Sequence, residues 1–322
     1  MKVMEEKSLF IINSPFQALC AIDAIKHYSI NNPVFYVFDC GDSRDKILML
    51  LNYKKLFNVD IIPFVGTKDL IKVIKAKPKY HQIFIGDYFS YNQYLIGIQL
   101  SKRNTIIVYL DDGTATLDLL PNVGRKRYHG FKLRTFSYLY LNICRNIKRV
   151  KESFYSIFDI SGKIPYPVVE NDFSCLMANK ADSSNKGVYI IGTNSSALPF
   201  KGKNYLDLLC GLVRIIKERY PDEEVFYCPH RRDTNNYDEL LEKHHINIYQ
   251  TAISVEVDFA TKGINPLCII GFASTALITL RRLFPQSKVQ SIRFEIEDPF
   301  TESSIRSIEE YYSNHGVEII EL

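Results

Sequence analysis

Several features that would quickly assign a function are missing from this sequence. Its seven cysteines form no CxxC pair, which argues against a zinc site or a disulfide framework and favours a reducing cytoplasm. No apolar run approaches the roughly 20 residues that cross a bilayer, and the apolar segment near the start is too short for a signal peptide. A net charge of +4 over 322 residues is too small to indicate a nucleic-acid partner. We therefore expect a cytoplasmic protein.

Strand and helix signals alternate along the chain. The length suffices for two domains, and the content of 46% hydrophobic and 24% charged residues is normal for a globular enzyme. This alternation predicts an α/β fold with two doubly wound parallel sheets, as two Rossmann-like domains facing across a cleft. The expected strands are Leu9–Asn13, Val34–Asp39, Val59–Phe64, Gln82–Ile85, Thr105–Leu110, Val188–Ile191, Val225–Cys228, Ile246–Tyr249, Leu267–Ile270 and Val289–Phe294. The expected helices are Pro15–His27, Ser43–Tyr53, Thr67–Lys75, Tyr91–Lys102, Tyr205–Arg219, Asp238–His244 and Ala276–Leu283.

A basic and aromatic segment separates the two series. We expect an N-terminal domain over 1–165, a linker over 166–185 and a C-terminal domain over 186–322, with a helical excursion inside Asn122–Asp172. The many Lys and Arg residues of 125–151, together with its Tyr and Leu residues, suit peripheral contact with an anionic membrane face. The same pattern also fits a solvated helix whose apolar residues complete the core or a homodimer contact.

Two adjacent acids follow the expected strand Thr105–Leu110. Asp111 and Asp112 would stand at the carboxyl end of a parallel strand, where α/β sheets place ligands. One such carboxylate could take the proton of a sugar hydroxyl, and Asp111 is the favoured base, although spacing alone does not choose between neighbours. Helix capping and a metal site remain open alternatives.

Polar residues also follow strands of the second half, where they suit a phosphate-bearing ligand. His230 and Arg231 could donate hydrogen bonds to phosphate oxygens, and Ser274 and Thr275, after Gly271, could present hydroxyls and backbone N–H groups at a helix start. Glu256 could bind ribose hydroxyls, with Asp258 as a competitor. The turn at Gly192 and Thr193 could hold a base or sugar. Each loop also has an ordinary reading as a turn, a cap or a solvated face.

Taken in order, these motifs resemble those of bacterial GT-B sialyltransferases, most closely glycosyltransferase family 52. Asp111-Asp112-Gly113 is similar to the family's acidic motif, and Ser274-Thr275 is similar to its hydroxyl motif. The family's His-Pro motif matches only in part, because Arg231 follows His230. The opening, with Asn13 and Gln17, resembles the family's first strand–helix turn.

The resemblance implies a GT-B glycosyltransferase that inverts the anomeric centre, with CMP-sialic acid (CMP-Neu5Ac) as donor and no obligatory metal or cofactor. It implies that an acid of the Asp111-Asp112 pair is the base, and that His230, Ser274 and Thr275 stabilise the departing phosphate. Glu256 would bind the ribose, while Asn13 and Gln17 would lie in the acceptor half. The acceptor would be a galactose-terminated glycan of a bacterial capsule or lipooligosaccharide.

Three other functions remain open. The first is a GT-B glycosyltransferase that uses a UDP- or GDP-sugar, and the second is a non-catalytic nucleotide- or sugar-binding protein of glycan assembly. The third is a sugar-nucleotide epimerase with the GT-B fold. A comparison of CMP and UDP as stabilising ligands would separate the first alternative from a sialyltransferase. For the second alternative, replacement of both acids should leave the function intact.

Overall fold

The structure is a computed structural model, and it divides the chain into two compact units, Met1–Cys175 and Leu176–Leu322. No helix within the described part of the chain is long and apolar enough to span a membrane. The structure describes residues 7–63, 70, 74–75, 77–117, 132–177, 186–194, 200–201, 205–230, 233, 236–237 and 243–321, of which 132–138 and 300 are described by their backbone alone.

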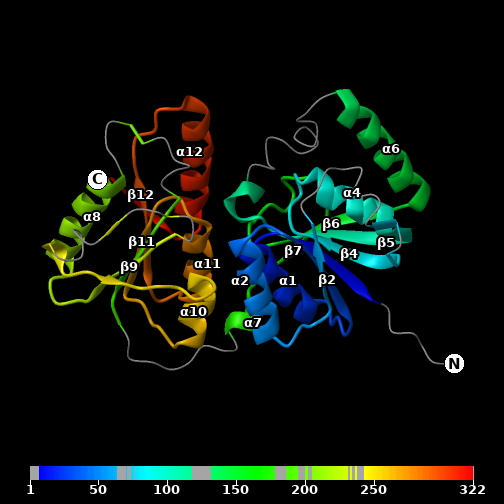
Figure 1. Ribbon diagram of the computed structural model, residues 1–322. Helices are drawn as coiled ribbons and strands as arrows, with labels where there is room; N and C mark the ends of the chain where they lie inside the picture. Colours follow the sequence, from blue (N-terminus) through cyan, green and yellow to red (C-terminus); the bar gives the residue numbers. More distant parts are fainter. Residues whose placement is uncertain are drawn as a thin grey trace. The chain divides into compact units, whose positions relative to one another are not determined.

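The first unit is built on a parallel seven-stranded sheet in the order β3-β2-β1-β4-β5-β6-β7 (Figure 1). Its strands are β1 (Ser8–Ile12), β2 (Pro33–Phe38), β3 (Val59–Ile62), β4 (Tyr80–Ile85), β5 (Ser101–Tyr109), β6 (Lys151–Ser156) and β7 (Val168–Glu170). Its helices are α1 (Pro15–His27), α2 (Asp42–Tyr53), α4 (Tyr91–Leu100), the short 3₁₀ turn η1 (Gly113–Thr116), α6 (Lys132–Lys148) and α7 (Ser174–Met177), which crosses the unit boundary.

The second unit has a parallel six-stranded sheet in the order β10-β9-β8-β11-β12-β13. Its strands are β8 (Val188–Ile191), β9 (Val225–Cys228), β10 (Asn247–Ile248), β11 (Cys268–Gly271), β12 (Lys288–Arg293) and β13 (Glu318–Glu321). Its helices are α8 (Tyr205–Arg219), α10 (Val255–Thr261), α11 (Thr275–Leu283) and α12 (Pro299–Asn314).

Both sheets follow one topological pattern. Counted within each unit, the first six strands lie in the order 3-2-1-4-5-6, which is the Rossmann arrangement. The chain reverses direction across the sheet between β1 and β4, and again between β8 and β11. Ligands of such sheets bind outside the carboxyl ends of the strands at these switch points. The two Rossmann-like sheets expected from the sequence are thus confirmed.

Buried strands and capped helices account for these elements. All five residues of β1 are buried, as expected for a strand covered on both faces. The Ser14 side chain caps α1 by accepting a hydrogen bond from the Gln17 N–H, and Pro15 stands at the first helical turn, where its missing N–H costs nothing. The same strand–cap–helix sequence recurs at Ser274 and α11.

The structure corrects two boundaries expected from the sequence. Residues 166–185 are not all linker, because Val168–Glu170 pairs with β6 as the last strand of the first sheet. Helix α4 ends at Leu100, two residues before the expected end at Lys102, and the strand before the two acids begins at Ser101 instead of Thr105. Strand β13 and helix α12 were not expected from the sequence. Most of Thr67–Lys75 and Asp238–His244, expected as helices, lies outside the described residues.

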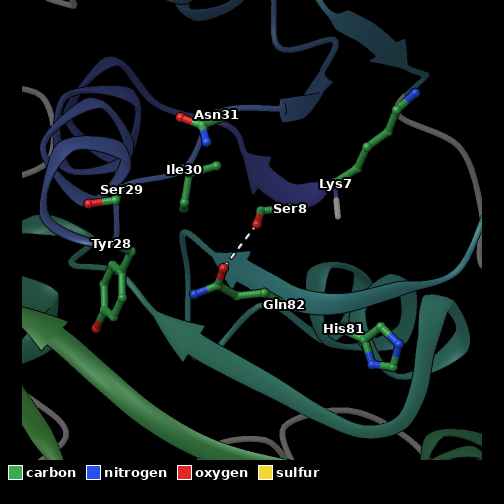
Figure 2. Close-up of a pocket in the computed structure, with 8 residues that line it drawn as sticks. All are labelled: Lys7, Ser8, Tyr28, Ser29, Ile30, Asn31, His81 and Gln82. Carbon is green, nitrogen blue, oxygen red and sulfur yellow. Dashed lines mark hydrogen bonds between the residues drawn. The ribbon is translucent and has the colours of Figure 1, made fainter. Parts of the chain in front are cut away.

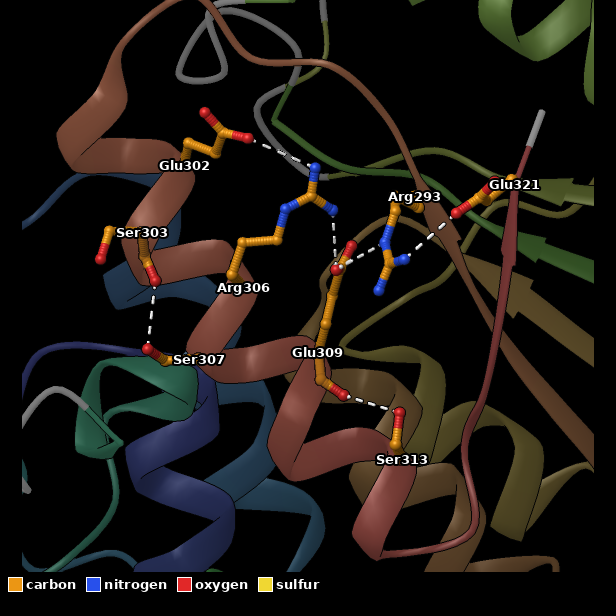
Figure 3. Close-up of polar contacts among 8 residues, drawn as sticks. All are labelled: Arg293, Glu302, Ser303, Arg306, Ser307, Glu309, Ser313 and Glu321. Atoms are coloured by element: carbon orange, nitrogen blue, oxygen red, sulfur yellow. Dashed lines mark hydrogen bonds and ion pairs between the residues drawn. The ribbon is translucent and has the colours of Figure 1, made fainter.

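Helix α12 is tied to its sheet by a buried carboxylate. Glu309 accepts hydrogen bonds from Arg293 of β12 and from Arg306 of its own helix, both at 2.9 Å (Figure 3). Arg293 also pairs with Glu321 of β13, and Arg306 pairs with the half-buried Glu302. The hydrogen bond to Glu309 raises the pKa of Arg306. One buried acid therefore joins the last helix to the last two strands.

We expect Glu309→Gln to lower the free energy of unfolding by about 1.5–3 kcal/mol, because it removes a buried charge that accepts from two arginines. Glu302→Gln is the matched control: it removes a partner of the same Arg306 whose side chain is 45% exposed, and it should cost no more than about 0.5 kcal/mol. Urea unfolding measures both. Equal effects of the two substitutions would contradict the role given to Glu309.

Candidate functional site

The two acids stand where the chain turns out of β5. Strand β5 ends at Tyr109, and Gly113 adopts a positive φ of 68° that permits the turn into η1. The Asp112 N–H donates to the Thr116 side chain at 3.3 Å, which closes this turn. The acids therefore lie at the carboxyl edge of the first sheet, as the sequence predicts.

Asp111 is completely buried, and its hydrogen bonds connect neighbouring strands of the first sheet. Its Oδ1 accepts a hydrogen bond from the Ser156 hydroxyl, and its Oδ2 accepts one from the Ile157 N–H, both at 2.7 Å. Both donors follow or end β6, the strand that pairs with β5. The carboxylate thus joins the ends of two neighbouring strands, and neither of its oxygens is directed to solvent.

Asp112 is half-buried, and its side chain is held by a residue of α1. The Gln17 Nε2 donates to its Oδ1 at 2.7 Å, while the Gln17 Oε1 accepts from the Asn13 N–H at 2.9 Å. Gln17 is fully buried, so its amide is locked between the end of β1 and the end of β5. The structure therefore brings together Asn13, Gln17 and Asp112, three residues that the sequence singles out.

Gly86, which the sequence analysis did not single out, makes this arrangement possible. It follows β4, and its N–H donates to the carbonyl of Ile11 at 2.9 Å. A Cβ added there would lie 2.1 Å from the Gln17 Oε1, so only glycine leaves room for the buried amide. A glycine directly after an expected strand was the available signal.

In the second unit, Gly192 and His230 meet at the ends of neighbouring strands. Ile191 pairs with Cys228, so the loops after β8 and β9 leave the sheet together. A Cβ on Gly192 would come within 2.9 Å of the His230 backbone nitrogen and 2.6 Å of the Tyr227 Oη. His230 itself is half-buried. Arg231, expected to reach a phosphate, lies outside the described residues.

A buried tyrosine cluster lies beneath these loops. The Tyr227 hydroxyl lies 3.0 Å from those of Tyr205 and Tyr237, and Asp233 accepts from Tyr227 and Tyr237. The Thr193 N–H donates to the Tyr205 hydroxyl at 3.4 Å. Burial raises the pKa of Tyr227, and that of Tyr205 to about 12, so both stay protonated donors. The cluster connects the loop after β8 to the segment that follows His230.

The loop from Gly271 to Thr275 leads from β11 into α11. Gly271 packs closely on β8, because an added Cβ would lie 3.1 Å from the carbonyl oxygen of Ile191. Ala273 adopts a positive φ of 34°, and the Ser274 Oγ then accepts from the Ala276 N–H at 3.3 Å as the helix cap. Ser274 and Thr275 are both half-buried at the carboxyl edge of β11. The loop thus lies beside the Gly192 loop, across the second switch point.

Glu256 and Asp258 have different surroundings. Glu256, on the first turn of α10, accepts a hydrogen bond from the Thr279 hydroxyl at 3.0 Å, one turn beyond Thr275 in α11. Asp258 accepts from the Ala252 N–H at 3.0 Å and from Lys262 at 2.8 Å. These two hydrogen bonds connect Asp258 only to the segment before α10 and to the residue that follows this helix. Glu256 is therefore the acid tied to the Ser274 loop's helix.

A polar hollow of about 200 Å³ opens at the opposite edge of the first sheet (Figure 2). It lies at the amino ends of β1 and β4, where the Ser8 hydroxyl donates to Gln82 at 2.9 Å. His81 of β4 also lines it. Because ligands of Rossmann-like sheets bind at the carboxyl edge, this hollow is not part of the candidate site.

Comparison with solved structures identifies the fold as GT-B. The GT-B domain of a sialyltransferase from Photobacterium damselae superposes with a TM-score of 0.56 and 14% identity, covering 98% of this chain and all of that one. A 2,6-sialyltransferase from Photobacterium sp. JT-ISH-224, in complex with CMP and lactose, gives 0.53 and 12%, covering 97% and 78% of the chains. UDP-GlcNAc 2-epimerase from Neisseria meningitidis, bound to UDP-GlcNAc, gives 0.50 and 11%, covering 96% and 90%. No protein-family model and no curated protein matches by sequence.

We expect Gly86→Ala to lower the free energy of unfolding by about 1–3 kcal/mol, because the new methyl group must displace the buried Gln17 amide. Gly211→Ala is the control: it lies in α8, nothing stands within 4 Å of an added Cβ, and it should be neutral or stabilising by up to about 1 kcal/mol. Urea unfolding compares them. A neutral Gly86→Ala would show that Gln17 is not held as described.

Proposed function

We propose that the protein is an inverting sialyltransferase that transfers sialic acid from CMP-Neu5Ac to a galactoside hydroxyl. One observation carries the proposal: Asp112 is a half-buried carboxylate, oriented by Gln17, at the carboxyl edge of the first Rossmann-like sheet. The similar sialyltransferase structures support the choice of chemistry, since one of them holds CMP together with lactose. The acidic and hydroxyl motifs of the sequence support the same choice.

Asp112, rather than Asp111, is the general base in this proposal. A base must come within hydrogen-bond distance of the proton it removes, and both Asp111 oxygens already accept from groups around the end of β6. Asp112 is partly exposed, and its hydrogen bond from Gln17 fixes its direction. This proposal replaces Asp111, the base favoured from the sequence, with Asp112. Asn13 and Gln17 then line the acceptor side.

The second unit supplies the donor site in this proposal. His230 and the hydroxyls of Ser274 and Thr275 stand at the ends of β9 and β11, on either side of the Gly192 loop. These groups suit a phosphate, because imidazole and hydroxyl groups and helix N-termini donate hydrogen bonds to anions. Glu256, which is bonded to α11, is proposed to bind the ribose hydroxyls. Arg231, Thr193 and Gly271 complete the proposed set.

The proposed reaction is a single displacement. Asp112 takes the proton of the acceptor hydroxyl while the acceptor oxygen bonds to the anomeric carbon of the sialic acid. The bond from that carbon to the CMP phosphate breaks, and its electron pair leaves with CMP. Because charge builds up on the departing phosphate, preorganised donors at His230 and Ser274 lower the barrier. We propose that no metal or other cofactor takes part, and undiminished transfer in EDTA would support this.

We expect Asp112→Asn to reduce transfer from CMP-Neu5Ac to lactose by roughly 10²- to 10⁴-fold, the usual contribution of a general base. Folding should be unaffected, because an asparagine oxygen can still accept from Gln17. Mass spectrometry of the sialylated product measures the rate. Retention of more than about a tenth of the wild-type rate would reject Asp112 as the base.

Asp111→Asn is the matched control for this experiment. It should lower the free energy of unfolding by about 1–3 kcal/mol, because an asparagine amide cannot accept from both buried donors. Loss of transfer in Asp111→Asn with unchanged unfolding would instead assign the base to Asp111.

A second candidate function is an enzyme acting on a UDP-sugar, since the epimerase from Neisseria meningitidis shares the fold and is bound to UDP-GlcNAc. Thermal unfolding with each nucleotide separates the two. A sialyltransferase should be stabilised by CMP, and an epimerase or UDP-dependent transferase by UDP.

We expect His230→Ala to weaken CMP binding and to slow transfer together, because the proposed phosphate contact exists in both substrate and product. His81→Ala is the control, since His81 lies at the opposite edge of the first sheet. Calorimetric titration with CMP and steady-state rates measure the two effects. A slower rate with unchanged CMP affinity would confine the His230 contact to the transition state.

A further inference from the structure

Helix α6 turns its apolar side chains outward. Among its described residues, Leu139, Tyr140, Ile143 and Ile147 are exposed by 57%, 56%, 50% and 72%. At 3.6 residues per turn these positions fall on one face of the helix, within about 100°. Figure 1 shows α6 (green) at the outer side of the first unit, beyond α4. We call these four residues the α6 apolar face.

Polar groups and one leucine hold the opposite side of α6 to the domain. Lys148 donates to the carbonyl of Ile98 at the end of α4 at 2.6 Å. Arg145 pairs at 2.6 Å with the buried Glu152, while Leu141 is fully buried. A surface helix normally buries its apolar face and exposes its charges. This helix does the reverse over its last two turns, so its apolar face is built for contact with something outside the unit.

The charge around α6 indicates what that contact is. Residues 119–151 contain nine Lys and Arg residues and no Asp or Glu, whereas the whole chain has a net charge of only +4. The rest of the chain is therefore net acidic. Arg149 and Lys151, directly after α6, are exposed. Ile106, 44% exposed, lies opposite Lys151 in the β5–β6 pair and adds apolar surface beside these charges.

We propose that the α6 apolar face and the basic residues beside it dock the first unit on an anionic lipid bilayer. An interfacial helix combines apolar and aromatic side chains on one face with Lys and Arg around them, and anionic headgroups attract the cations. A second copy of the chain fits less well: a two-fold contact would place this acid-free segment against itself, bringing like charges together. The docking does not depend on the proposed chemistry.

The test is flotation of the full chain with vesicles of equal parts phosphatidylglycerol and phosphatidylcholine, and with phosphatidylcholine vesicles alone. We expect binding to the anionic vesicles that weakens at high salt, because screening reduces headgroup attraction. Ile143→Asn with Ile147→Asn should abolish the binding. Arg149→Glu with Lys151→Glu should lower the affinity at least about tenfold.

Two matched controls make the result specific. Met49→Asn with Tyr53→Asn removes comparably exposed apolar side chains from α2, and Arg214→Glu with Arg219→Glu makes the same charge change on α8. Neither control should alter vesicle binding, and thermal unfolding checks that every variant is folded.

The proposal is wrong if the wild type does not bind anionic vesicles at low salt, or if Ile143→Asn with Ile147→Asn binds normally. It is also wrong if those substitutions only convert a dimer to a monomer, measured by light scattering. Transfer to soluble lactose reports separately on the proposed function.

Discussion

Parallel pairing of the strands is the constraint on which the rest of this structure depends. In a parallel sheet every strand ends at the same edge, so loops far apart in sequence leave the sheet side by side. The register places Ile11, Ile85 and Tyr109 across three neighbouring strands of the first sheet. It places Ile191, Cys228 and Gly271 likewise in the second. The described residues of the candidate site lie at or after these strand ends or begin the helix after one, except Glu256 of α10, which accepts a hydrogen bond from Thr279 of α11.

Two adjacent acids after β5 have different surroundings: one is buried and hydrogen-bonded within the sheet, and the other is half-buried in the candidate site. Asp111 and Asp112 follow the end of β5, where the chain turns toward η1 and their side chains meet different neighbours. Asp111 turns toward β6 and accepts two buried hydrogen bonds, while Asp112 turns toward β1 and meets Gln17. A buried carboxylate without such donors would be costly. The donors from Ser156 and Ile157 thus make the burial of Asp111 favourable, whereas Asp112 is only half-buried.

One glycine in each unit allows a neighbouring group to approach the backbone closely. Gly86 in the first sheet and Gly192 in the second each follow a strand beside a switch point, and an added Cβ would collide with a site residue at both. In each case a neighbouring polar group approaches the backbone closely. Helix α6, in contrast, is attached to its sheet by charged groups, which leaves its apolar side chains free for the proposed lipid contact.

The sequence alone determined the alternation of strands and helices, the two Rossmann-like sheets and the positions of the polar loops. These are local properties: apolar runs such as 105–110 and caps such as Ser274 need only neighbouring residues. The tertiary structure decided the different surroundings of Asp111 and Asp112, the close approach of Gly86 to Gln17 and the outward face of α6. It also placed Val168–Glu170 in the first sheet, where a linker was expected. The hydrogen bonds of Asp111, Asp112 and α6 join residues 45 or more positions apart. Val168–Glu170 pairs with β6, and Gly86 lies close to Gln17. The spacing of residues along the chain predicts none of these contacts.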